Sequence, residues 1–179
     1  MGKYRDELIR AMTWLGEQPD TFFLGQAVGV KGTAMFGTLE NVPMEKRLEL
    51  PVFENTQLGM SVGMAVNGTV PISIFPRWNF LLCACDQLVN HLDKLATYSH
   101  GEYKPKVIIR TGIGSQRPMH PQAQHIGDFT AGFQKILTNI DIIRCDEPED
   151  IFHAYELAYR REDGKSTIIV EWGDFHNEK

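Results

Sequence analysis

Apolar residues follow two different patterns along the chain, and each predicts a different kind of element. Short unbroken apolar runs are typical of buried strands, whereas apolar residues spaced three or four apart are typical of helices that bury one face. The short runs predict strands at 21–24, 70–75, 106–110, 140–144 and 166–171. The longer pattern predicts helices at 3–16, 54–66, 79–96, 128–137 and 148–160. Strands and helices therefore alternate along most of the chain.

This alternation predicts the fold class. Unbroken apolar strands separated by helices indicate a mostly parallel sheet covered on both faces, so we expect a doubly wound α/β fold. We expect a single domain over residues 1–179, with a core of about 20–172. Glycine-rich loops at 28–45 and 111–126 follow two of the predicted strands. Ligands of such sheets bind at the carboxyl ends of the strands, so both loops are expected near a site.

Composition removes several classes of function. The chain is 42% hydrophobic and 23% charged with a net charge of −5, which argues against nucleic-acid or anionic-membrane partners. No apolar run is long enough to span a bilayer, and the N-terminus lacks the pattern of a secretory signal. Cys83, Cys85 and Cys145 form no metal-ligand or disulfide framework. We expect reduced, mostly buried thiols in a cytoplasmic protein, and no metal ligands on this chain.

Glu54 begins one of the predicted helices, and Gly59 and Gly63 follow it, each with an apolar residue directly after. At a helix start the dipole favours an ionised carboxylate, whereas burial beside Phe53, Leu58 and Met60 favours the neutral acid. A carboxyl group between these influences can exchange a proton with a ring nitrogen. The glycines would admit a flat ligand or a second backbone. Alone, such a glutamate is more often a simple helix-terminal acid, and such glycines also serve helix packing.

The whole pattern, Glu-x-x-x-x-Gly-apolar-x-x-Gly-apolar, resembles the pyrimidine-domain signature of thiamine-diphosphate enzymes. From about residue 20 to 172 the chain resembles the pyrimidine-binding domain of the transketolase group, most closely the beta subunit of 2-oxoacid dehydrogenase first components. The segments that carry the resemblance are LGQAVG (24–29), PVFENTQLGMSVGMAVNG (51–68), PISIFPRWNFLLCACDQLVNHLDK (71–94), VIIRTGIGS (107–115), QAQH (122–125) and IIRCDEPEDIFHAYELA (142–158).

The resemblance implies roles for particular residues. Glu54 would contact the N1′ nitrogen of the cofactor, and Phe80 would stack on its aminopyrimidine ring. His125 would handle substrate protons near the reactive carbon. Gln26, where the family usually has glutamate, would also lie at the cofactor. Taken alone, Phe80 is equally consistent with a core aromatic, and His125 with a local loop contact.

Other residues have weaker assignments. His120 is a second candidate in the same loop as His125. Arg110 is expected to brace the loop through carboxylates or carbonyls rather than to touch substrate. Arg77 and Trp78 are expected at the entrance. Two departures from the family, at Gln26-Ala27 and at Ile74, lie near the pocket and predict different substrate or proton handling.

Half of the expected site has no counterpart in the sequence. The family binds the cofactor's diphosphate through Mg²⁺ on a domain marked by Gly-Asp-Gly, and this sequence has no Gly-Asp-Gly. We therefore expect a separate subunit with the Mg²⁺-diphosphate half, in an α2β2-like assembly. The family's C-terminal domain is also missing, so the chain is either a natural short subunit or a fragment. This favours a transketolase-like enzyme acting on a ketose or 2-oxoacid. A beta-type subunit of a 2-oxoacid dehydrogenase or decarboxylase, and a non-catalytic scaffold, stay open.

Overall fold

The computed structural model describes residues 3–117 and 120–177. Within them six strands form one all-parallel sheet in the order β2-β1-β3-β4-β6-β5. The strands are β1 (Thr21–Gly25), β2 (Arg47–Glu49), β3 (Val70–Phe75), β4 (Ile108–Ile113), β5 (Ile140–Arg144) and β6 (Ser166–Trp172). The helices are α1 (Lys3–Glu17), α2 (Ala34–Thr38), α3 (Glu54–Val66), α4 (Trp78–Leu81), α5 (Leu95–Tyr98), α6 (Thr130–Ile136) and α7 (Pro148–Arg160).

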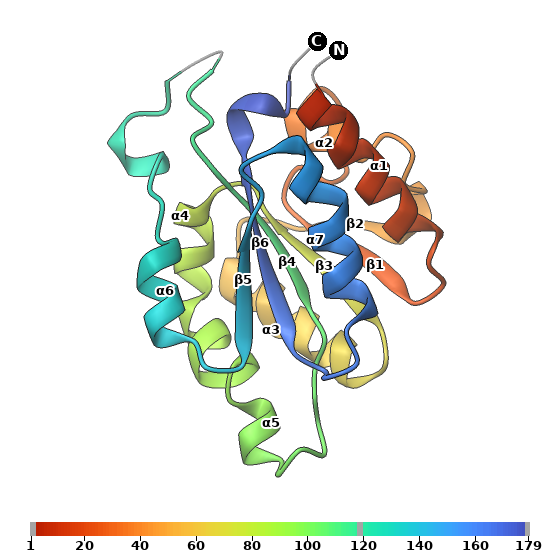
Figure 1. Ribbon diagram of the computed structural model, residues 1–179, viewed down its shortest axis with the longest axis vertical. Helices are drawn as coiled ribbons and strands as arrows, with labels where there is room; N and C mark the ends of the chain where they lie inside the picture. Colours follow the sequence, from red (N-terminus) through yellow and green to blue (C-terminus); the bar gives the residue numbers. More distant parts are fainter. Residues whose placement is uncertain (1–2, 118–119, 178–179) are drawn as a thin grey trace.

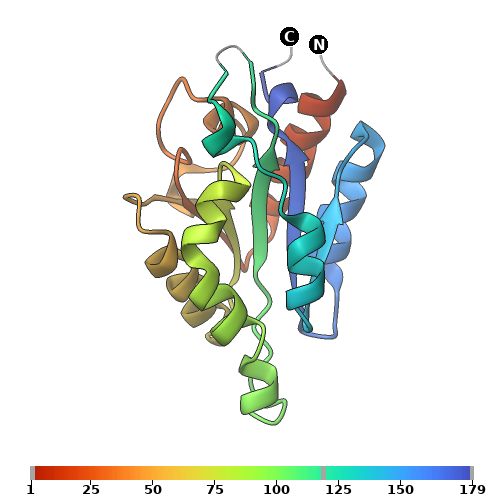
Figure 2. The same cartoon turned by 90° about the vertical axis from the view of Figure 1, so that its left-hand side faces the viewer.

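Helices cover both faces of the sheet. In Figure 1, α1 and α7 lie side by side in front of it and α3 lies behind; Figure 2 shows the layers from the side. Alternate residues of one strand point to opposite faces, so Ile108 packs with the α1 and α7 cluster while Ile109 packs with the opposite cluster. This arrangement confirms the predicted doubly wound α/β fold. No helix in the described ranges is long and apolar enough to cross a membrane.

The predicted helix at 79–96 is wrong as a single helix. The chain forms α4, a 3-10 turn at Leu82–Ala84, a π-helical turn at Gln87–Leu92 and then α5. Just after the π turn, the buried Asp93 carboxylate accepts hydrogen bonds from the backbone N–H groups of Thr138 and Asn139, at 2.9 and 2.7 Å. The spacing of apolar residues does not distinguish an α-helical turn from a π-helical turn. The interruption of the helix is therefore visible only in the structure, where Asp93 contacts Thr138 and Asn139.

The first loop, predicted as irregular over 28–45, contains a short helix and is followed by an unpredicted strand. Thr33 caps α2 by accepting a hydrogen bond from the Phe36 N–H at 3.1 Å. The edge strand β2 is three residues long and mostly polar, which hides it from an apolar-run criterion. The second loop begins later than predicted because β4 continues to Ile113.

A buried ion pair lies between β4 and β6. Arg110 and Glu171 are both fully buried, and the guanidinium donates to both carboxylate oxygens at 2.9–3.1 Å. The Tyr155 hydroxyl of α7 also donates to Glu171, and His176 Nε2 lies 2.9 Å from it. Burial pushes the pKa of Glu171 up, but Arg110 and His176 outweigh it and lower the pKa to about 2. Arg110 thus pairs with a strand carboxylate and does not brace the loop directly.

The cysteine prediction is wrong in part. Cys145 is buried, as expected, and burial together with nearby carboxylates raises the pKa of its thiol. Cys85 is half-buried and Cys83 is exposed. All three thiols are free.

Candidate functional site

Glu54 is the first residue of α3, and its side chain is only 7% exposed. Gln26, which directly follows β1, donates from Nε2 to Glu54 Oε1 at 3.0 Å. The chain can turn closely at this point because residue 25 is glycine: its φ is +141°, and a Cβ there would collide with the Ile74 carbonyl. The structure therefore brings two of the sequence-predicted residues into contact, with the amide donating to the carboxylate.

Phe80 and His125 form a second contact pair. Phe80 lies in α4, after β3, and His125 ends a 3-10 turn in the loop after β4. Their ring centroids are 5.4 Å apart at an interplanar angle of 66°, an edge-to-face arrangement. The Nδ1 atom of His125 is buried and has no hydrogen-bond partner among the described residues. A buried imidazole nitrogen without a partner is costly unless a ligand or water satisfies it.

The two pairs share one edge of the sheet. Glu54 follows β2, Gln26 follows β1, Phe80 follows β3 and His125 follows β4, and β2-β1-β3-β4 are consecutive neighbours in the sheet. In parallel sheets this carboxyl edge is where ligands bind. No hydrogen bond or ring contact among the described residues joins one pair to the other.

Both loops at this edge are held in strained backbone conformations. Ala27, Ser115 and Gln122 have φ values of +61°, +56° and +66°, which L residues rarely adopt. Carboxylates from other segments hold the loops: Glu49 accepts the N–H groups of Ala27 and Gly29 at 2.8 and 2.7 Å. Strain of this kind persists where surrounding contacts fix it and is concentrated at functional sites.

Asp174, which follows β6, holds the second loop in the same way. It accepts the N–H groups of Gln116 and Arg117 at 2.7 and 3.1 Å. A hollow of about 320 Å³ lies between the two loops, and Ala27, Arg77 and His176 are among its lining residues. The pKa of Arg77 is lower than its ordinary value because the side chain is partly buried, and the nearby Asp174 charge offsets part of this shift.

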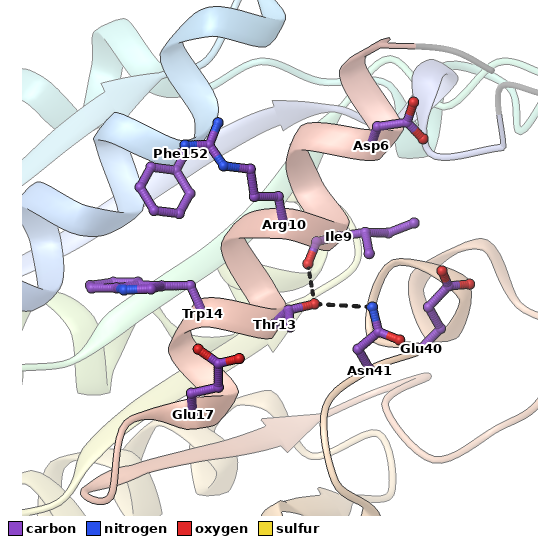
Figure 3. A pocket seen from close by; sticks show the side chains of 9 residues that line it. All are labelled: Asp6, Ile9, Arg10, Thr13, Trp14, Glu17, Glu40, Asn41 and Phe152. Carbon is purple, nitrogen blue, oxygen red and sulfur yellow. Dashed lines mark hydrogen bonds between the residues drawn. The ribbon is translucent and has the colours of Figure 1, made fainter.

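A larger hollow, of about 550 Å³, lies away from these residues. Figure 3 shows its lining from α1, from α7 and from residues 40–41, with Arg10 extended over the Phe152 ring. None of the predicted site residues lines it. We therefore place the candidate site at the carboxyl edge of the sheet because the predicted residues lie there, although the hollow at that edge is the smaller of the two.

Several expected neighbours of the site lie elsewhere. Trp78, expected at the entrance, is fully buried and stacks on Phe133 at 5.1 Å, so it belongs to the core. Leu58 is buried near Glu54 as expected, but Phe53 and Met60 are 65% and 38% exposed. The apolar surroundings expected around Glu54 are thus incomplete in this chain.

Of the remaining candidates from the sequence, Gly59 packs against another segment, whereas His120 and Gly63 are exposed. His120 is exposed, and its Nδ1 accepts the Gln122 N–H at 3.1 Å. A Cβ at Gly59 would lie 3.3 Å from Gln87 Oε1, so this chain already covers that glycine. Gly63 has no atom within 4 Å of such a position and is uncovered.

One residue near the site was missed in the sequence, and one contact of a predicted residue was not foreseen. Gln57, one turn after Glu54, is buried and donates to Ser73 Oγ and to the Ile74 carbonyl at 3.1 and 2.9 Å. Its spacing of three from Glu54 puts it on the same face of α3, which was the available signal. Arg77, which was expected at the entrance, lines the hollow between the two loops, and its Nη1 donates to two carbonyls of the His125 loop. No sequence signal identifies that contact.

Known proteins resemble this chain in sequence or in fold. The beta-3 subunit of the chloroplastic pyruvate dehydrogenase E1 component of Oryza sativa subsp. japonica is 31% identical over 88% of this chain and 40% of its own length. The 3-methyl-2-oxobutanoate dehydrogenase subunit beta of Mycobacterium tuberculosis (strain CDC 1551 / Oshkosh) is 27% identical over 72% of this chain and 37% of its own. The chain thus spans about two fifths of the length of these relatives.

A solved structure described as "Split gene transketolase, inactive beta4 tetramer" superposes with a TM-score of 0.71 at 18% identity, over 93% of this chain and 50% of that one. At that identity the likeness concerns the fold. The model of the family described as "Transketolase, pyrimidine binding domain" matches residues 5–172, which is most of the chain. The chain therefore belongs to the family of transketolase-type pyrimidine-binding domains.

Proposed function

We propose that this chain is the pyrimidine-binding half of a two-component, transketolase-like thiamine-diphosphate enzyme. The observation that carries the proposal is the arrangement at the carboxyl edge, where four neighbouring strands present Glu54, Gln26, Phe80 and His125. The family membership and the relatives named as E1 beta subunits support the same cofactor. The enzyme would form or cleave a carbon–carbon bond beside the carbonyl of a ketose or 2-oxoacid.

The residues present fit the pyrimidine half of thiamine diphosphate. Glu54 Oε1 accepts the Gln26 amide, and an ionised carboxylate keeps further acceptor sites for a ring N–H. Phe80 is half-buried and offers a flat apolar ring. The buried Nδ1 of His125 has no partner among the described residues and can bond to a bound molecule. When bound, the cofactor supplies the carbon nucleophile that adds to the substrate carbonyl.

The residues of this chain would move protons and position the reacting groups. Glu54 would exchange a proton with the N1′ nitrogen, as a general acid and base. Gln26 would hold the carboxylate in place, and as an amide it cannot itself take up that proton. His125 would give or take a substrate proton at a ring nitrogen, since a neutral imidazole has one nitrogen that donates and one that accepts.

A partner subunit would supply the diphosphate half, with its Mg²⁺. In the part of the chain that the structure describes, no group of three or more His, Cys, Asp or Glu side chains is placed to hold a metal ion. The outer face of α3, defined here by Met60, Gly63 and Val66, is exposed and apolar. Val52 and Phe53, just before α3, are 70% and 65% exposed. We propose that this surface packs against the partner in an α2β2-like assembly, which would also complete the surroundings of Glu54.

A substitution at Gly63 tests the interface. We expect Gly63→Leu to leave the isolated chain folded, because its Cβ meets no atom within 4 Å. A close interface would then be overpacked by about 1–3 kcal/mol, which weakens association about 5- to 150-fold. Gly132→Leu on α6 is the matched control, since that helical glycine is equally open. Sedimentation of each variant with the partner measures the dissociation constants, and equal values for the two variants would exclude α3 from the interface.

An assay of this chain reconstituted with its partner subunit, thiamine diphosphate and Mg²⁺ distinguishes the possible classes of reaction. Transfer of a two-carbon unit from a ketose to an aldehyde supports the transketolase-like proposal. Carbon dioxide release from a 2-oxoacid supports the alternative that the dehydrogenase-type relatives favour, a dehydrogenase or decarboxylase subunit. A pair that assembles and shows neither reaction favours the scaffold alternative.

A further inference from the structure

The loop after β4 is fastened at its two ends by one side chain. Arg77, between β3 and α4, donates from Nη1 to the Ser115 carbonyl at 3.3 Å and to the His125 carbonyl at 3.1 Å. These acceptors are ten residues apart in sequence, so a single guanidinium nitrogen closes the loop. Hydrogen bonds from a charged donor are stronger than those between neutral groups.

The loop needs such an anchor because its backbone is strained at both ends. Ser115, whose carbonyl is one of the two Arg77 acceptors, has a φ of +56°, and Gln122, three residues before the other acceptor, has a φ of +66°. Such conformations are unfavourable and persist only where other contacts impose them. Beyond the loop, the Gly127 N–H donates to Asn79 Oδ1 at 3.2 Å. Arg77 and Asn79 thus bind the loop on either side of the turn that carries His125.

The anchor and the ring that His125 contacts come from the same part of the chain. Arg77, Asn79 and Phe80 belong to one short stretch of chain, and the His125 ring meets the Phe80 ring edge-to-face at 5.4 Å. The backbone of His125 is therefore held by Arg77 while its ring contacts Phe80, three residues further along. Releasing the carbonyl would let the ring move relative to Phe80.

We propose that Arg77 is a positioning residue that fixes the His125 ring against Phe80 through the His125 carbonyl. It would act on the reaction only through His125, so its catalytic consequence rests on the proposed function. The placement of the ring does not rest on that function and can be measured in the chain alone.

The first test uses the isolated chain. Nuclear Overhauser contacts between the Phe80 and His125 ring protons are expected in the wild type, lost in Arg77→Met and retained in Arg77→Lys, whose ammonium also offers several donors. Arg5→Met is the matched control, because Arg5 also donates to a backbone carbonyl, that of Gly37, away from the loop. Arg5→Met should keep the ring contact. Thermal unfolding separates local release from loss of the fold, and persistence of the contact in a folded Arg77→Met overturns the proposal.

The second test uses the reconstituted enzyme. We expect Arg77→Met to lower kcat about 10- to 100-fold, as small misplacements of reacting groups do. The double variant Arg77→Met/His125→Ala should be no slower than His125→Ala alone, because residues that act through one another are not additive. A further loss in the double variant would mean that Arg77 acts on substrate directly, against the proposal. Loss of the ring contact with unchanged kcat would support the anchor and refute the role of His125 in the proposed function.

Discussion

Glu54→Gln is expected to lower the turnover of the reconstituted enzyme by about 10²- to 10⁴-fold, the usual contribution of a general acid–base group. Glutamine has nearly the same shape and keeps an oxygen that can accept the Gln26 amide, so the contact between residues 26 and 54 should survive. What the variant loses is the ability to exchange a proton with the cofactor ring.

Turnover at saturating cofactor and substrate measures this effect. The control is Glu45→Gln, which removes an exposed glutamate shortly before α3 and should leave turnover unchanged. Circular dichroism verifies that both variants fold. A Glu54→Gln enzyme as fast as the control would remove Glu54 from the chemistry and leave it as a helix-terminal acid.

The second large effect concerns the fold. Glu171→Gln and Arg110→Met should each destabilise the chain by about 3–5 kcal/mol, because each leaves one buried charge without its partner. The double variant Arg110→Met/Glu171→Gln should be more stable than the sum of the two losses predicts, since the groups are in direct contact. Urea unfolding of all three variants measures these free energies.

A surface pair of the same chemistry provides the control. Glu156→Gln breaks the exposed pair with Arg160 on α7 and should change the free energy of unfolding by less than about 0.5 kcal/mol. A Glu171→Gln cost as small as that would mean that the buried pair adds nothing to the fold.

The same carboxylate predicts how stability depends on pH. The pKa of Glu171 is about 2 in the folded chain, against an ordinary value of 4.5. The group's folded pKa is depressed, so its contribution is complete above about 4.5 and is lost progressively as pH falls toward 2. Glu171→Gln should therefore flatten the acid limb of the stability profile in that window.

The sequence predicted what repeats in a regular pattern. Five of the strands were found because short, mostly apolar runs predict strands, and β5 and α7 even have the predicted bounds. The short polar strand β2 and the π turn were missed, because each exists only through its tertiary partners. Local patterns contain no information about such partners.

For the candidate site, the sequence identified individual residues but not the contacts between them. The motif identified Glu54, and the wider resemblance identified Phe80 and His125, but neither indicated which residues touch. The contact of Gln26 with Glu54 spans 28 positions, and that of Arg77 with the His125 carbonyl spans 48. Both depend on parallel strands that bring distant loops to one edge. Trp78 is the opposite case: it was expected at the entrance of the site, but this large side chain is fully buried in the core.

Glu54 is expected to act only when a second polypeptide brings the Mg²⁺-diphosphate half opposite it. Calorimetric titration of thiamine diphosphate with Mg²⁺ into this chain, into the partner that carries Gly-Asp-Gly, and into their equimolar mixture tests it most directly. We expect tight binding to the mixture, with affinity reduced by Glu54→Gln, and no measurable saturation of this chain alone. Binding to the isolated chain as tight as to the mixture would refute this dependence on a second polypeptide.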